Sequence, residues 1–168
     1  DVEDMFEGTS VIIVKDGSGN FFMPGMNLIG DWDYKRGYAV AMGEAEEVTF
    51  VSNDVDQSAD IELTIGWNFI SYLPDAQYGA DYALGSVMDN LAILKGQTQF
   101  WIPNLTNPFG MAPGQGYKLG MYNFDTLNYP DGAGKTDAPV SEAIAEAVHY
   151  AVNSSIDYYP IVLNGLEM

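Results

Sequence analysis

The sequence predicts an all-β fold made of two tandem similar units, each sandwich-like or barrel-like, with one C-terminal helix. Three observations lead to this prediction. Short β-branched and aromatic runs alternate with turns rich in Gly, Asn and Pro along most of the chain. The order of these runs repeats at an offset of 79 to 80 residues. Near the end of the chain, residues 141–152 instead show helical periodicity.

The composition excludes several classes of protein. The chain has 168 residues, of which 47% are hydrophobic and 13% aromatic, so it can bury a core. Its formal net charge of -18 repels phosphates and anionic lipids, so we expect neither nucleic-acid binding nor membrane insertion. The absence of Cys excludes disulfides, zinc–thiolate sites and Cys nucleophiles. No apolar run predicts a membrane span, and the first residues do not predict a signal peptide.

The first expected unit spans residues 1–60. It opens with the β-branched run Val11–Lys15, and turn residues at 16–20 predict that this run enters a hairpin with Phe21–Met23. Residues 37–42 then alternate like a half-buried strand, and residues 47–51 predict a further strand.

The second expected unit, residues 61–130, repeats this order. Lys95 corresponds to Lys15 at an offset of 80, whereas Tyr117 corresponds to Tyr38 at an offset of 79. A one-residue deletion in the hairpin turn reconciles the two offsets. Such self-similarity is typical of a duplicated supersecondary unit. The repeated strands are expected at residues 91–95, 100–103, 116–121 and 126–129.

The second unit begins with the densest apolar segment of the chain, residues 66–74, where alternation predicts that Trp67 lies in the core. The first unit lacks this opening strand, because Asp1 aligns with Asp81. A sheet without it leaves backbone N–H and C=O groups unpaired along one edge. We expect a neighbouring chain or the strand-like C-terminal tail to cover that edge. The candidate residues for this strand complementation are Tyr158, Tyr159, Ile161 and Leu163.

Residues 131–168 are expected to form a linker, a helix and that tail. Turn-forming residues at 130–137 predict the linker. The helix is predicted from Ser141 near its N-cap and from apolar residues on one face of 141–152. His149, the one His of the chain, lies in this helix, and no Gly-x-Ser-x-Gly motif accompanies it. We therefore predict no catalytic residue and no enzymatic activity.

Two segments alternate oxygen-bearing side chains as calcium loops do. The first, at residues 16–20, also fits a plain hairpin turn. The second contains Asp54, Asp56 and Asp60, and its alternative is a solvated acidic loop. Neither has the Gly and the Glu that an EF-hand loop requires. We expect no cofactor, and Ca²⁺ at these three Asp residues is the candidate metal site.

Aromatic residues are candidates for ligand binding. Trp32 and Tyr34 are the predicted ligand-binding residues, because an aromatic face can replace water against a sugar ring or an extended peptide. Phe22, Phe100 and Trp101 lie at positions that recur in both units, which favours core packing for them.

The pattern Gly-Trp-Asn-x-Ile-Ser-Tyr at 66–72 precedes an apolar strand ending in Lys95, an aromatic-x-Pro triplet at 101–103 and Gly-Tyr at 116–117. This order resembles a β-rich repeat module of large secreted and surface proteins of Bacteroidetes, many of which are exported by the type IX secretion route. The resemblance covers about residues 1–130. It implies an extracellular, non-catalytic module between or after other domains.

Together these features predict a structural or adhesive module of a cell-surface or filament-forming protein, extracellular and able to self-associate by strand complementation. The alternative is a carbohydrate- or peptide-binding accessory module of a secreted enzyme. That alternative predicts that Trp32 and Tyr34 belong to an exposed aromatic row.

Overall fold

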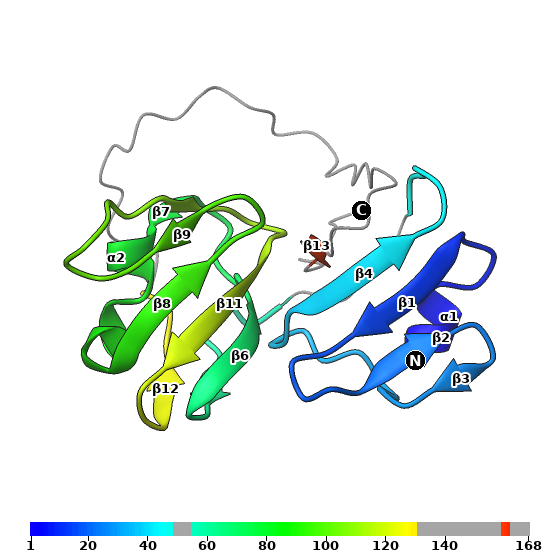
Figure 1. Cartoon of the computed structure of the whole chain (residues 1–168), viewed down its shortest axis with the longest axis horizontal. Helices are drawn as coiled ribbons and strands as arrows, with labels where there is room; N and C mark the ends of the chain where they lie inside the picture. The colour runs from blue at the N-terminus through cyan, green and yellow to red at the C-terminus, as the bar shows by residue number, and fades with distance from the viewer. Residues whose placement is uncertain (49–54, 131–158, 162–168) are drawn as a thin grey trace.

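The computed structural model describes residues 1–48 and 55–130, together with the backbone of a strand at 159–161. Within these residues the protein is mostly β-sheet with a few short helices, which confirms the all-β class. The described residues form two lobes that lie side by side (Figure 1). The first lobe contains residues 1–48 and 159–161, and the second contains residues 55–130.

The first lobe is built on one antiparallel sheet, named the first sheet below. Its β-branched central strand, β1 (Val11–Lys15), continues into β2 (Phe21–Met23) through a hairpin turn, as predicted. The buried Asp16 carboxylate holds this turn by accepting hydrogen bonds at 2.8 Å from the backbone N–H groups of Ser18 and Asn20. A short helix, α1 (Val2–Met5), precedes the sheet. Among the described residues, the strand order is β13 (Tyr159–Ile161), β4 (Tyr38–Met42), β1 (Val11–Lys15), β2 (Phe21–Met23) and β3 (Met26–Asn27).

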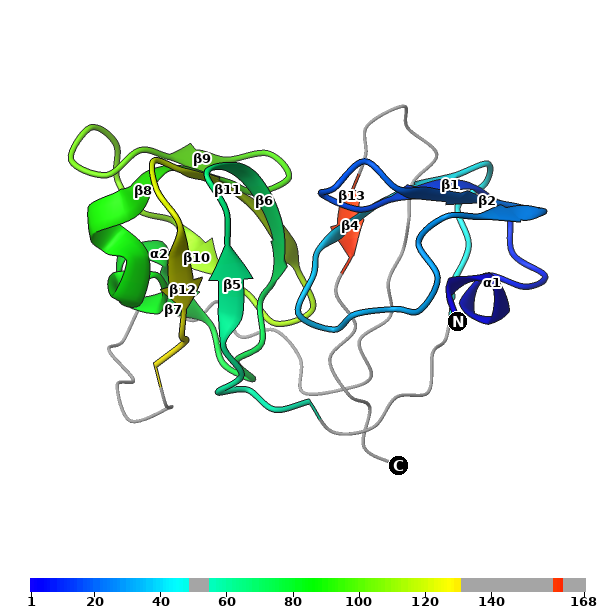
Figure 2. The same cartoon turned by 90° about the horizontal axis from the view of Figure 1, so that it is seen from below.

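The second lobe is built on the second sheet, whose described strands are β6 (Gly66–Ser71), β11 (Gly116–Met121), β8 (Leu91–Lys95) and β9 (Phe100–Trp101), in that order. Figure 2 shows the short helices and the small ladders on one side of this sheet. The opposite side is its outer face. The covering elements are β5 (Ile61–Leu63) paired with β12 (Asp125–Leu127), β7 (Tyr78–Gly79) paired with β10 (Gly110–Met111), α2 (Ala80–Ala83) and the 3₁₀ helix η1 (Gly85–Asn90).

Each lobe has its own hydrophobic core among the described residues. In the second core, the buried ring of Tyr129 stands edge-on to that of Tyr72, with centroids 5.3 Å apart. The Tyr129 hydroxyl donates a hydrogen bond of 2.8 Å to the carbonyl of Ser71. In the first core, Tyr38 packs among Val14, Phe22 and other buried side chains.

The prediction that Trp67 lies in the core is wrong. Its side chain is 52% exposed, whereas Ile70 of the same strand is 1% exposed. Residues at odd and even positions of a strand face opposite sides of the sheet, and β6 carries apolar residues at both. The face of β6 that carries Ile70 packs against the core, so Trp67, on the other face, points outward. Phe100 is also exposed, at 56%, contrary to the core packing predicted for it.

Several predictions lie outside the described residues: the helix at 141–152 with His149, part of the strand at 47–51, Asp54, Tyr158 and Leu163. No helix in the described part of the chain is both long and apolar enough to cross a membrane.

Candidate functional site

The first candidate site is the edge of the first sheet, where β13 pairs antiparallel with β4. Tyr159 lies opposite Val40, and Ile161 lies opposite Tyr38. Two of the four residues predicted for strand complementation therefore lie in the strand that covers this edge. β13 also lies beside β11 of the second lobe, so it sits between the two sheets (Figure 1).

Pro160 fixes which backbone groups of β13 face β4. It lies opposite Ala39, and it has no N–H to exchange with that residue. In an antiparallel ladder, pairs that exchange hydrogen bonds alternate with pairs that do not, so Pro160 occupies a pair of the second kind. The backbone groups of Tyr159 and Ile161 then face β4. The outer edge of β13 lacks a donor at Pro160, which disfavours the addition of another strand there.

The corresponding edge of the second sheet is covered by a loop of the first lobe. The N–H of Gly37 donates to the carbonyl of Phe69 at 3.1 Å, and the N–H of Ser71 donates to the carbonyl of Lys35 at 3.2 Å. The Ser71 hydroxyl also donates to the carbonyl of Tyr34. These bonds satisfy outward-facing groups of β6 and join the lobes. This contact could not be predicted from the sequence, because the loop shows no strand pattern.

Gly37 is required by this close approach. A Cβ atom at residue 37 would lie 2.7 Å from the carbonyl oxygen of Ile70 and 3.1 Å from its nitrogen, both backbone atoms. We expect Gly37→Ala to lower the free energy of unfolding by about 1–3 kcal/mol, because the loop must move away from β6. Urea denaturation would measure this change. As a control, Gly85→Ala meets no atom within 4 Å and should change stability by less than about 0.5 kcal/mol. Equal stability of the two variants would contradict the close approach.

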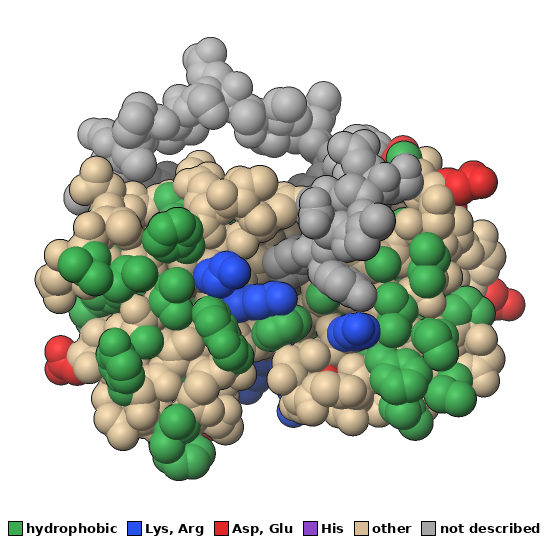
Figure 3. Space-filling view, viewed as in Figure 1, with side chains coloured by type: hydrophobic (Ala, Val, Ile, Leu, Met, Phe, Trp, Pro, Cys, Tyr) green, Lys and Arg blue, Asp and Glu red, His purple; other side chains and the backbone are tan. Residues whose placement is uncertain are grey.

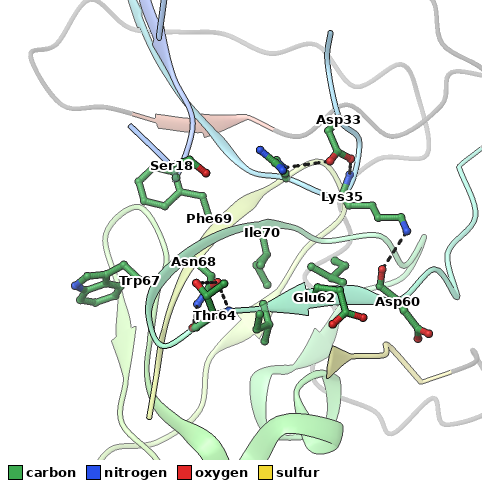
Figure 4. Close-up of a pocket in the computed structure, with 14 residues that line it drawn as sticks. Ser18, Asp33, Lys35, Asp60, Glu62, Thr64, Trp67, Asn68, Phe69 and Ile70 are labelled. Atoms are coloured by element: carbon green, nitrogen blue, oxygen red, sulfur yellow. Dashed lines mark hydrogen bonds and ion pairs between the residues drawn. The ribbon is translucent and has the colours of Figure 1, made fainter. Parts of the chain in front are cut away.

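A groove with a volume of about 320 Å³ runs along the same edge of β6, between the lobes. Figure 4 shows Trp67 at one end and Lys35 with Asp60 at the other. Most of its polar groups bind one another. The Lys35 ammonium donates to the carbonyl of Asp60 at 3.1 Å, and Arg36 Nε lies 3.2 Å from an Asp33 carboxylate oxygen. The Lys35 bond joins the two lobes, whereas Arg36 and Asp33 both belong to the loop of the first lobe.

The predicted ligand-binding residues Trp32 and Tyr34 do not form one aromatic row. Trp32 is half-buried, and its ring stacks on Tyr38 with centroids 3.9 Å apart, against the first core. Tyr34 is also half-buried, but it packs against the second core. The two rings thus pack against different cores, Trp32 against the first and Tyr34 against the second.

Of the three predicted metal residues, Asp56 and Asp60 lie in the described part of the chain, and neighbouring polar groups bind both of them. The carboxylate of Asp56 accepts hydrogen bonds from the Ser58 hydroxyl at 2.8 Å and from the Ser58 N–H at 3.0 Å, which hold the pKa of Asp56 below its usual value. The carboxylate of Asp60 accepts one from Asn128 at 2.9 Å. No three His, Cys, Asp or Glu side chains of residues 1–48 and 55–130 come together as metal ligands.

Comparison with known proteins supplies no identity. No family model, curated protein or solved structure matches the chain. The resemblance to Gly-Trp-Asn repeat modules therefore stays a prediction, and the function has to be inferred from the contacts described above.

Proposed function

We propose that the protein is an extracellular structural or adhesive module, part of a cell-surface or filament-forming protein, that assembles by strand complementation. In this proposal two similar units each need an opening strand, and β13 supplies that of the first unit. The observation that carries the proposal is the register of β13, which takes beside β4 the place that β6 takes beside β11.

The ladders of the two sheets support two similar units. Lys15 lies opposite Ala39 in the first sheet, and Lys95 lies opposite Lys118 in the second. The offsets between these pairs are those found in the sequence. Both ladders also shift register near their far end, at Met42 and at Met121. The hairpins β1–β2 and β8–β9 likewise share one register.

Hydrogen bonds outside the ladders repeat as well. The hydroxyl of Tyr38 accepts a hydrogen bond of 2.9 Å from the N–H of Asp33, and that of Tyr117 accepts one of 2.9 Å from Ala112. Each donor lies five residues before its Tyr. The N–H groups that begin the two helices also find equivalent carbonyls, Val2 with Gly30 and Ala80 with Phe109.

The helix contacts correct one detail of the sequence alignment. Since Val2 corresponds to Ala80 in its hydrogen bond, Asp1 corresponds to Gly79 and not to Asp81.

The register of β13 matches that of β6. Ile161 lies opposite Tyr38 as Ile70 lies opposite Tyr117, and both strands run antiparallel to their partner. An Ile therefore occupies the same place in both sheets. β13 comes from a distant part of the chain to pair with β4. A second copy of the chain can therefore donate the same strand, and repeated donation produces polymers.

The test is removal of residues 156–168, comparing assembly of the full chain and the truncated chain by light scattering at increasing concentration. We expect the full chain to assemble and the truncated chain to remain a monomer. A peptide of residues 156–168 should bind the truncated chain, because it restores the strand beside β4.

Two peptide variants sharpen this test. Ile161→Pro removes an N–H that faces β4 and should weaken peptide binding by about tenfold or more. Pro160→Ala leaves the bonds to β4 unchanged, so its binding should stay within about threefold of the parent peptide. Polymers of the truncated chain, or equal binding of the two variants, would refute strand complementation.

A further inference from the structure

The outer face of the second sheet carries a row of aromatic and basic side chains. Lys95 lies directly opposite Phe100 on one side and Lys118 on the other, and Lys118 lies opposite Phe69. Directly opposite residues share a face of the sheet, so these four side chains form one row across it. Figure 3 shows this face of the molecule, with Lys and Arg side chains gathered near the junction of the lobes.

The two lysines of this row are an unfavourable pair that nothing in their own lobe neutralises. Like charges directly opposite each other in a sheet are destabilising. The chain has 24 Asp and Glu residues, yet no described carboxylate lies within 4.0 Å of either ammonium group. Lys118 lies 4.3 Å from the centre of the Phe69 ring, and burial together with Lys95 lowers the pKa of Lys118. A bound anion would relieve this repulsion.

Trp67 lies next to this pair on the same face. It is opposite Gly120, and a Cβ atom at residue 120 would lie 3.7 Å from Cζ3 of the indole. The missing side chain of Gly120 leaves space for the indole to reach over the sheet, while half of its surface stays exposed. A rigid sheet thus presents an aromatic surface beside two ammonium groups.

We propose that this face binds an acidic polysaccharide. One sugar ring stacks on Trp67, and carboxylates of the polysaccharide pair with Lys95 and Lys118. The apolar side of a sugar ring packs on an indole, and carboxylates form charge-assisted hydrogen bonds with ammonium groups. Because strands lie about 4.8 Å apart, the four-residue row spans roughly 14 Å, which is the length of a few sugar rings.

The same observations favour a saccharide over an acidic peptide. Peptides usually add to a sheet through unpaired backbone groups at an edge. The edge of β6 is already bonded to the loop at Lys35 and Gly37, and β8 and β11 are paired on both sides. The outer face offers ring surfaces and charges, which suit a carboxylated sugar. The proposal does not rest on strand complementation, because the four residues of the row belong to strands of the second sheet, whereas β13 pairs with β4 of the first sheet.

The test uses the full chain, oligogalacturonate as the probe and the methyl-esterified form of the same oligosaccharide as the neutral control. Calorimetry and tryptophan fluorescence would follow binding. We expect oligogalacturonate to bind about tenfold or more tightly than its ester, with an affinity that falls as salt rises. Lys95→Ala and Lys118→Ala should each weaken binding about three- to tenfold, and Trp67→Ala about tenfold.

Matched variants keep the test sharp. Tyr82→Ala changes an aromatic residue of α2, on the opposite side of the second sheet from this face, and should bind like the parent. Trp67→Phe keeps a ring, so it should retain affinity within about threefold while losing the fluorescence change on binding. The proposal is overturned if oligogalacturonate fails to bind at millimolar concentration or binds no better than its ester. It is also overturned if polyglutamate binds as tightly and Trp67→Ala has no effect.

Discussion

Replacing Tyr129 with alanine is expected to lower the free energy of unfolding by about 3–5 kcal/mol. The Tyr129 ring is buried and packs edge-on against Tyr72, so its removal leaves a cavity in the second core. The hydroxyl also bonds the carbonyl of Ser71, whose N–H and side chain hold the loop at Tyr34 and Lys35. The loss therefore reaches both the core and the junction of the lobes. Urea denaturation measures the change.

Two other variants separate the contributions at this site. Tyr129→Phe keeps the ring and removes the hydroxyl, which leaves the buried Ser71 carbonyl without this donor and should cost about 1–3 kcal/mol. Tyr122→Ala removes a ring that is 67% exposed and should change stability by less than about 0.5 kcal/mol. If Tyr129→Ala behaves like Tyr122→Ala, the position assigned to Tyr129 in the core is wrong.

The protein is also expected to unfold steeply as the pH rises above about 10. Burial raises the pKa of the Tyr38, Tyr72, Tyr117 and Tyr129 hydroxyls above the usual value. Below pH 10 these groups are neutral in both the folded and the unfolded chain, so their contribution to stability is fully present. At higher pH the unfolded chain loses these protons first. Each such Tyr then lowers the free energy of unfolding by about 1.4 kcal/mol per pH unit.

Tyrosinate absorbance and circular dichroism, followed together through an alkaline titration, check this expectation. We expect the buried hydroxyls to ionise together with the loss of sheet signal. Tyr117→Phe removes one of the four groups and should make the decline of stability with pH less steep. Ionisation of all tyrosines near pH 10 with an intact sheet signal would contradict the burial of these hydroxyls.

The all-β class and the main strands could be predicted from the sequence, because the relevant signals are local. Val11–Lys15 is β-branched and is followed directly by turn residues, so its hairpin with Phe21–Met23 follows from neighbouring residues alone. Strands were likewise predicted at residues 91–95 and 100–103, and the structure has β8 and β9 there.

The features that could not be predicted depend on contacts between distant residues or on very short elements. Helices of four residues, such as α1 and α2, are too short to show periodicity. The outward position of Trp67 depends on which face of β6 meets the core. The sequence does not indicate that face, because β6 has apolar residues at both odd and even positions. The opposition of Lys95 and Lys118 depends on the register between β8 and β11, which neither strand reveals alone.

The pairing of β13 with β4 also has a consequence for how the chain folds. β4 lies in the first third of the sequence and β13 near its end, so the first sheet cannot be completed until residue 161 has left the ribosome. The described strands of the second lobe all lie between Ile61 and Leu127 and can pair earlier. Most of the first lobe is therefore synthesised before the second lobe. Its sheet is completed last, because contacts between distant residues form slowly.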